Sequence, residues 1–170
     1  GIDDGFMLDC FRVVAGLPEG VMIVHAENVE VVNRLKNRLK EQGRHDLAAW
    51  TESRPDFAEA EAVRRAMYFA EVAGCRIHFL HLTSSRALRE ITDFSDRYPH
   101  VSVEVCHPYL SFTQDDMRTL EMKVKPPFRS KEDIDALWKG IKSGQVTSVG
   151  SDHVPRQKHS KMAGTWSPVT

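Results

Sequence analysis

Three short apolar runs each lead into a side chain that can bind a metal ion, and this repeated pattern constrains the fold most strongly. The runs open the motifs Val24-His25-Ala26-Glu27-Asn28, Phe79-Leu80-His81-Leu82-Thr83 and Val149-Gly150-Ser151-Asp152-His153. Apolar runs of this length are typical of buried parallel strands, whose carboxyl ends meet at one rim of a barrel. Imidazole and carboxylate groups are zinc ligands. We therefore predict that His25, His81 and Asp152 gather as metal ligands at that rim.

Strand-like and helix-like patterns alternate along the whole chain, with little linker between them. This order is expected of an α/β fold with a parallel sheet, here of about four βα units. Strands are predicted over residues 21–24, 77–82, 101–105 and 146–149. Helices are predicted over residues 3–14, 28–43, 56–74, from a cap at Ser84 or Ser85 to about residue 98, and over 130–144, with a polar loop through Arg54-Pro55.

Composition and charge exclude several classes of protein. With 170 residues, of which 41% are hydrophobic, the chain is expected to form one domain or less. The 23 basic and 24 acidic residues leave a net charge of -1, which gives no indication of a polybasic surface for nucleic acid or anionic membrane. No apolar run approaches the roughly 20 residues of a membrane-spanning helix, and no signal-peptide pattern is present. A small-molecule partner is therefore expected.

The three cysteines, Cys10, Cys75 and Cys106, are far apart and lie in or beside apolar runs. This pattern predicts reduced, buried thiols and a cytoplasmic location. The chain begins at Gly1 rather than at Met, which is compatible with processing or with a fragment.

A single histidine after a strand is more often a hydrogen-bonded structural residue than a ligand, so the other histidines need separate consideration. His78 lies three positions before His81, an odd step that points the two side chains to opposite faces, and we interpret it as structural. His153 either orients the carboxylate of Asp152 or contacts the substrate. The remaining histidines in polar surroundings, which we expect at the surface, are His45, His100 and His159.

Taken in order, the motifs resemble those of the cyclic amidohydrolases, the branch of the amidohydrolase superfamily that contains allantoinases, hydantoinases or dihydropyrimidinases, and dihydroorotases. The resemblance spans nearly the whole chain. Its most specific parts are His25-Ala26-Glu27-Asn28, the stretch from Ser53-Arg54-Pro55 to Val72-Ala73-Gly74-Cys75, and His81-Leu82-Thr83-Ser84-Ser85, followed by Val105-Cys106-His107-Pro108-Tyr109-Leu110, Pro126-Pro127-Phe128-Arg129 and Ser151-Asp152-His153.

The resemblance implies a TIM (β/α)8 barrel that carries two divalent metals, usually zinc, and opens a cyclic amide or imide by hydrolysis. By the same resemblance, His25 and His81 bind one metal, and Asp152 binds the other metal and serves as the general base. The physical logic agrees, because two metals can share a hydroxide while a carboxylate moves its proton to the leaving nitrogen.

Two family motifs are not found in this sequence: a His-x-His pair on the first barrel strand and a carboxylated lysine on the fourth. Gly1 falls where the family has just passed that lysine. Residues 1–170 therefore resemble the second half of the barrel, a single partial TIM barrel domain. We expect the chain alone to be inactive or very weak, although the parent enzyme would be a hydrolase.

Smaller departures concern the substrate. Family members commonly have Ser or Asn, a residue that helps to bind the ring amide, where this chain has Lys125 before Pro126-Pro127. That lysine either pairs with an anionic substituent of the substrate or points to solvent. The order Cys106-His107-Pro108-Tyr109 replaces the family's Cys-Pro-His/Gln-Tyr, which is either a shifted loop or a neutral rearrangement. The segment 53–75 is similar to allantoinases and the segment 149–153 to hydantoinases or dihydropyrimidinases, so the resemblance does not select one substrate ring.

Two alternatives belong to other classes of protein. One is a catalytically silent amidohydrolase-like assembly protein, against which the joint presence of His25, His81 and Asp152 argues. The other is a free-standing half-barrel binding module, in which four parallel units would expose two unpaired sheet edges. Such a chain is expected to self-associate or to be unstable, so we predict a homo-oligomer.

Overall fold

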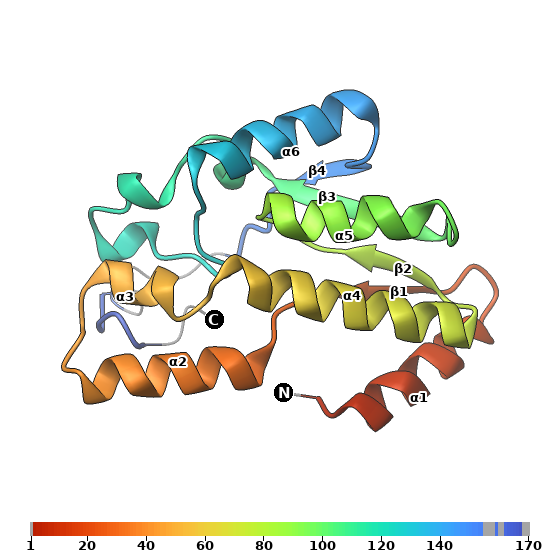
Figure 1. The fold of residues 1–170 in the computed structure, drawn as a ribbon, viewed down its shortest axis with the longest axis horizontal. Helices are drawn as coiled ribbons and strands as arrows, with labels where there is room; N and C mark the ends of the chain where they lie inside the picture. Colours follow the sequence, from red (N-terminus) through yellow and green to blue (C-terminus); the bar gives the residue numbers. More distant parts are fainter. Residues whose placement is uncertain (1, 155–158, 160–161, 168–170) are drawn as a thin grey trace.

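The computed structural model describes residues 2–154, 159 and 162–167, and its centre is a parallel sheet of four strands. The strands follow one another across the sheet in chain order, as successive βα units of a barrel do (Figure 1). The predicted α/β class with a parallel sheet is confirmed. The strands are β1 (Val21–Val24), β2 (Arg76–Phe79), β3 (Val101–Cys106) and β4 (Ser148–Gly150).

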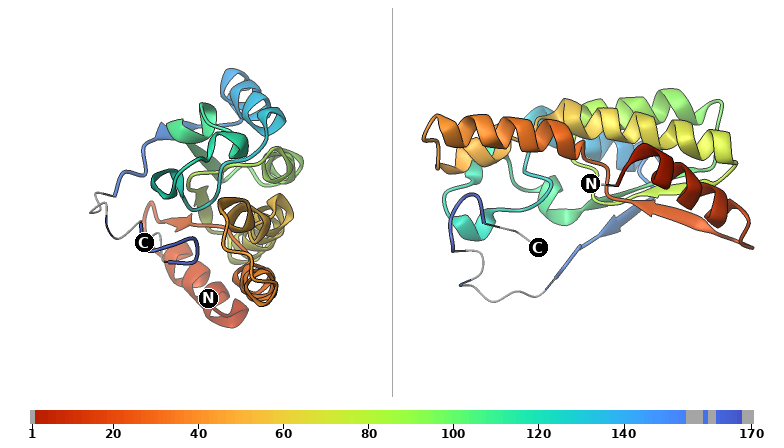
Figure 2. Two further views of the ribbon diagram at one scale, coloured as in Figure 1. Left: turned by 90° about the vertical axis from the view of Figure 1, so that its left-hand side faces the viewer. Right: turned by 90° about the horizontal axis from the view of Figure 1, so that it is seen from below.

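Helices α4, α5 and α6 follow one another along one side of the sheet (Figures 1 and 2). The α-helices are α1 (Asp4–Ala15), α2 (Val29–Glu41), α3 (Leu47–Glu52), α4 (Asp56–Ala73), α5 (Ser85–Ser95) and α6 (Lys131–Ser143). Three short 3-10 turns lie between β3 and α6: η1 (His107–Leu110), η2 (Gln114–Asp116) and η3 (Leu120–Met122).

The core lies between the sheet and these helices. Alternate residues of β2 point into it, so Ile77 and Phe79 are fully buried, and Val63 and Met67 of α4 face them. The stripe of alanines along α4 allows close packing: Ala58, Ala62, Ala66 and Ala70 are all buried. Burial of one face of each element is why the sequence periodicity located most of them.

The ends of the helices also agree with the sequence signals. The side chains of Asp3, Asn28 and Ser84 accept hydrogen bonds from the first turns of α1, α2 and α5. At α6, Ser130 and Asp133 form a capping box, and Gly144 ends the helix in the left-handed conformation.

Two elements differ most from the prediction, while α5 ends about three residues earlier than predicted and β4 begins two residues later. The predicted polar loop before Pro55 contains the short helix α3, which begins at an Asp46 cap and buries Ala49 and Trp50. The predicted strand 77–82 ends at Phe79, because the chain turns away from the sheet before His81.

The other side of the sheet is not covered by these helices (Figure 2). On that side Val21 and Ile23 of β1 are exposed, and Val149 of β4 is exposed at the opposite end of the sheet. In the part of the chain that the structure describes, β1 and β4 each have one neighbouring strand, so both sheet edges are open. No helix among the described residues is long and apolar enough to cross a membrane.

Candidate functional site

His25 and His81 meet at the carboxyl ends of two neighbouring parallel strands. His25 directly follows β1, and His81 follows β2 by two residues. Nδ1 of His25 lies 2.9 Å from Nε2 of His81, and the two rings meet edge to face with centroids 4.7 Å apart. The structure therefore brings two of the three predicted ligands into direct contact.

The backbone at His81 and Asp152 adopts the left-handed region that non-glycine residues rarely occupy, with φ of 37° and 45°. Backbone strain of this kind is concentrated at functional sites, where it aims a side chain that a regular strand would direct elsewhere. At His81 the turn is supported by Glu104 of β3, whose Oε1 accepts a hydrogen bond from the His81 backbone N at 3.4 Å.

His81 is buried, and its burial together with the neighbouring His25 lowers the pKa of its imidazole below the ordinary value. The negative charge of Asp152 opposes this shift, which places Asp152 within electrostatic range of the ring. His81 is consequently neutral near pH 7, and neutral imidazole is the form that binds metals.

Asp152 does not complete a metal-binding group in this structure. Within residues 2–154, 159 and 162–167, no set of three His, Cys, Asp or Glu side chains is close enough to hold a metal ion. Asp152 and His153 are exposed, and the backbone N of His153 donates to Ser151. The expected gathering of all three ligands is therefore seen for the two histidines alone.

Glu27 was not predicted as a site residue, yet its carboxylate lies beside His25. Its side chain is only 5% exposed, and Oε2 is 3.6 Å from Nε2 of His25 and 3.9 Å from Nζ of Lys125. Oε1 is 3.7 Å from Nε of Arg54. Burial alone would raise the pKa of Glu27, but His25, Arg54 and Lys125 lower it below the ordinary value, so the carboxylate is charged.

Lys125 was predicted to contact an anionic substrate group or to point to solvent. Its side chain is 36% exposed and faces Glu27, so it forms an ion pair within the protein. Neither of the two sequence alternatives included this internal partner.

Behind the histidines lies a buried polar network that joins three of the motifs. Glu59 of α4 accepts hydrogen bonds from the backbone N and Oγ1 of Thr83, both at 2.9 Å. Arg129 donates from Nε to Oγ1 of Thr83 and from Nη1 to the carbonyl oxygen of Arg54. Because Thr83 follows His81 by two residues, this network fixes the segment that carries the second histidine.

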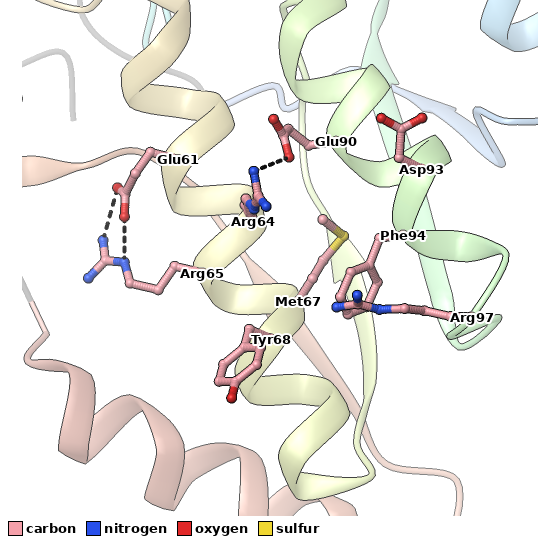
Figure 3. A pocket seen from close by; sticks show the side chains of 9 residues that line it. All are labelled: Glu61, Arg64, Arg65, Met67, Tyr68, Glu90, Asp93, Phe94 and Arg97. Carbon is pink, nitrogen blue, oxygen red and sulfur yellow. Dashed lines mark hydrogen bonds and ion pairs between the residues drawn. The ribbon is translucent and has the colours of Figure 1, made fainter.

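A concave region with a volume of about 610 Å³ lies on the outer surface between α4 and α5; Figure 3 shows the side chains that line it. Its arginines are paired with acids: Arg64 with Glu90 at 3.6 Å, Arg65 with Glu61 at 3.1 Å and Arg97 with Glu71 at 3.2 Å. The predicted ligands do not line it, and each of its three arginines is paired with an acid of the protein. The lining residues are Glu61, Arg64, Arg65, Met67, Tyr68, Glu90, Asp93, Phe94 and Arg97.

Successive parallel βα units of this kind are a segment of an α/β barrel, and known proteins share the arrangement. The chain is 37% identical to an allantoinase of Solibacter usitatus over 157 residues, which is 90% of this chain and 34% of that protein. It is 34% identical to an L-hydantoinase of Paenarthrobacter aurescens over 170 residues, 99% of this chain and 37% of that protein. No family model matches the chain.

Solved structures give the same result. An L-hydantoinase (dihydropyrimidinase) from Arthrobacter aurescens superposes with a TM-score of 0.91 at 32% identity, covering 98% of this chain and 37% of that one. A D-hydantoinase from Bacillus sp. AR9 superposes with a TM-score of 0.90 at 27% identity, covering 96% and 38%. The chain is therefore similar over nearly its whole length to allantoinases and hydantoinases, and it spans about a third of the length of the curated relatives it matches.

This family implies a metal centre, and the two histidines fit one. Two nitrogens on a tetrahedral zinc ion lie roughly 3.3 Å apart, because each bond is about 2.0–2.1 Å long. Nδ1 of His25 and Nε2 of His81, at 2.9 Å, need only a small outward shift to reach that separation. The buried and neutral His81 meets the chemical requirement as well.

Proposed function

We propose that this chain is part of a metal-dependent hydrolase that opens a cyclic amide or imide ring, of the allantoin, hydantoin, dihydropyrimidine or dihydroorotate type. The contact between His25 and His81 at the carboxyl ends of neighbouring strands carries this proposal. The homology with allantoinases and hydantoinases supports the reaction class. Both kinds of relative match comparably well, so the proposal names the class of ring rather than one substrate.

In this proposal His25 and His81 hold one metal ion, and zinc is the ion that their imidazole nitrogens favour. Asp152 is the proposed ligand of a second ion, for which a complete parent enzyme would supply the remaining ligands. When bound, the ions supply Lewis acidity toward the ring carbonyl and lower the pKa of the attacking water.

Asp152 is also the proposed general base. It accepts a proton from the water that adds to the ring carbonyl carbon, and it delivers that proton to the ring nitrogen as the C–N bond breaks. The product is a single open-chain molecule that carries the new carboxylic acid at one end and the freed nitrogen group at the other. The exposure of Asp152 leaves its carboxylate accessible to water and substrate.

Lys125 and His153 are the proposed substrate contacts. A lysine carries three donors, so the pairing of Lys125 with Glu27 leaves donors for a polar or anionic substituent of the ring. We further propose a homo-oligomer in a reducing, cytoplasmic setting, which the free Cys10, Cys75 and Cys106 support.

The test is hydrolysis of allantoin, hydantoin, dihydrouracil and dihydroorotate by the complete parent protein, loaded with zinc and compared with residues 1–170 alone. We expect the complete protein to open at least one of the four rings and the chain alone to be inactive or very weak. If the complete protein binds zinc and opens none of them, the hydrolase proposal is wrong and a silent assembly protein becomes the better interpretation.

A further inference from the structure

We propose that Glu27 is a positioning residue, whose carboxylate holds the imidazole of His25 with Nδ1 directed at the metal side. The inference rests on the proposed function, because it gives His25 the role of a ligand. It adds a residue for which the sequence motif alone indicated no task. Glu27 does not touch the reacting atoms in this proposal and acts through His25.

The two ring nitrogens of His25 face different neighbours. Nε2 lies 3.6 Å from Oε2 of Glu27, and Nδ1 lies 2.9 Å from Nε2 of His81. The ring is thus held from both of its nitrogens, with the carboxylate on one side and the second histidine on the other. A carboxylate beside one nitrogen favours the proton there, which leaves the lone pair on the other nitrogen for a metal.

The side chain of Glu27 is itself held in place by its neighbours. Its side chain is 5% exposed and lies between Arg54 and Lys125 at 3.7 Å and 3.9 Å. Arg54 is held in turn, because its guanidinium lies 3.5 Å above the ring of Trp50, and its Nη1 donates to Oγ of Ser53 at 2.7 Å. A positioning group must be rigid in this way to orient a ligand.

The ion pair between Glu27 and Arg54 leaves two buried polar atoms without a hydrogen bond. Among the described residues, neither Oε1 of Glu27 nor Nε of Arg54 has a hydrogen-bond partner. A buried ion pair that served stability alone would be expected to satisfy these atoms, since unpaired buried polar atoms are costly. The carboxylate is instead placed so that Oε2 faces the ring of His25.

The inference is tested by measuring which ring nitrogen of His25 carries the proton, with long-range 1H–15N spectra of the metal-free chain. In the natural sequence we expect the proton on Nε2. In Glu27→Gln, which keeps the shape and removes the charge, we expect a mixture of both tautomers and a Zn²⁺ affinity that is about 10- to 100-fold weaker. Glu27→Asp, which keeps the charge, should retain most of the preference for Nε2.

Glu71→Gln is the matched control, because Glu71 is a carboxylate on α4 that pairs with Arg97 at 3.2 Å, away from the segment that carries His25 and Glu27. It should leave both the tautomer and the Zn²⁺ affinity unchanged. A purely structural role for Glu27 predicts that Glu27→Gln lowers the unfolding midpoint while His25 keeps its proton on Nε2, and that result would overturn the inference.

A proton found mainly on Nδ1 in the natural sequence would also overturn it, even where Glu27→Gln does not fold. Because the tautomer is measured without metal, the inference and the hydrolase proposal can fail separately. Lack of ring opening by the complete protein tests the latter and leaves the role of Glu27 toward His25 unaffected.

Discussion

Replacing Arg129 with Met should destabilise the fold strongly, because it leaves the carboxylate of Glu59 buried without a cation. Glu59 is 3% exposed and Arg129 is 6% exposed, and Nη2 of Arg129 lies 4.0 Å from Oε2 of Glu59. Removing one partner of a buried ion pair costs about 3–5 kcal/mol. The free energy of unfolding of a domain is about 5–15 kcal/mol in total, so Arg129→Met would remove a large part of it.

The cost should also depend on pH, and its sign follows from the environment of Glu59. Burial raises the pKa of this carboxyl group, and the charge of Arg129 and the Thr83 and Ser84 hydrogen bonds oppose that rise. A pKa that is raised in the folded state means that stability is lost as pH increases through it. Without Arg129 the pKa rises further, so the variant should be penalised less at pH 5 than at pH 8.

The measurement is urea unfolding of the natural chain and Arg129→Met at pH 5 and pH 8, followed by tryptophan fluorescence. Arg86→Met is the control, because the Arg86–Asp56 pair is partly exposed, with side-chain exposures of 52% and 37%. It should cost less than about 1 kcal/mol. A loss below about 1 kcal/mol for Arg129→Met at pH 8, or a loss that is the same at both pH values, would refute the reasoning.

Three further predictions follow from the caps, the thiols and the sheet edges. Burial would raise the pKa of Asp133, but hydrogen bonds from Ser85 and Ser130 lower it below the ordinary value. The stabilisation by this carboxylate should therefore be present above about pH 3.9 and be lost as pH falls. Asp133→Asn should cost about 1 kcal/mol at pH 7, and thermal unfolding measured as a function of pH should then depend less on pH in the acid range. Burial raises the pKa of the Cys106 thiol to about 12, so iodoacetamide at pH 8 should label the partly exposed Cys10 first and Cys106 only after unfolding; equal labelling rates would contradict this. The open edges of β1 and β4 should make the 19.3 kDa chain self-associate, and light scattering that gives a stable monomer would contradict that.

The fold was largely predictable because its elements each bury one face. The alternation in β2 and the alanine stripe of α4 leave a periodic pattern that can be read without a structure. Helix α3 was missed although its Asp46 cap and its Leu47-Ala48-Ala49-Trp50 run were visible, because the segment is short and lies among polar residues. The early end of β2 depends on the turn at His81, which leaves no periodic signal.

The meeting of the two strand-end histidines was predictable, and the residues around them were less so. His25 and His81 follow apolar runs, and parallel pairing of β1 with β2 brings such positions together. The partners of Glu27 are 27 and 98 positions away along the chain, at Arg54 and Lys125, so only the folded chain shows that they converge. Glu59 would read as an ordinary acid in the first turn of a helix, and its burial under Thr83 is a tertiary property.

We propose that the strand-end histidines bind the metal of a ring-opening hydrolase. This proposal is tested most directly by zinc content after dialysis, together with ring hydrolysis, for the complete protein and its His81→Ala and His78→Ala variants. His78 is the control, because its Nδ1 lies 2.7 Å from Oγ of Ser102 and it does not contact His25. We predict that His81→Ala loses both its zinc and its hydrolytic activity, while His78→Ala keeps both. A His81→Ala protein that retains its zinc and its activity would contradict the proposed role of the histidines.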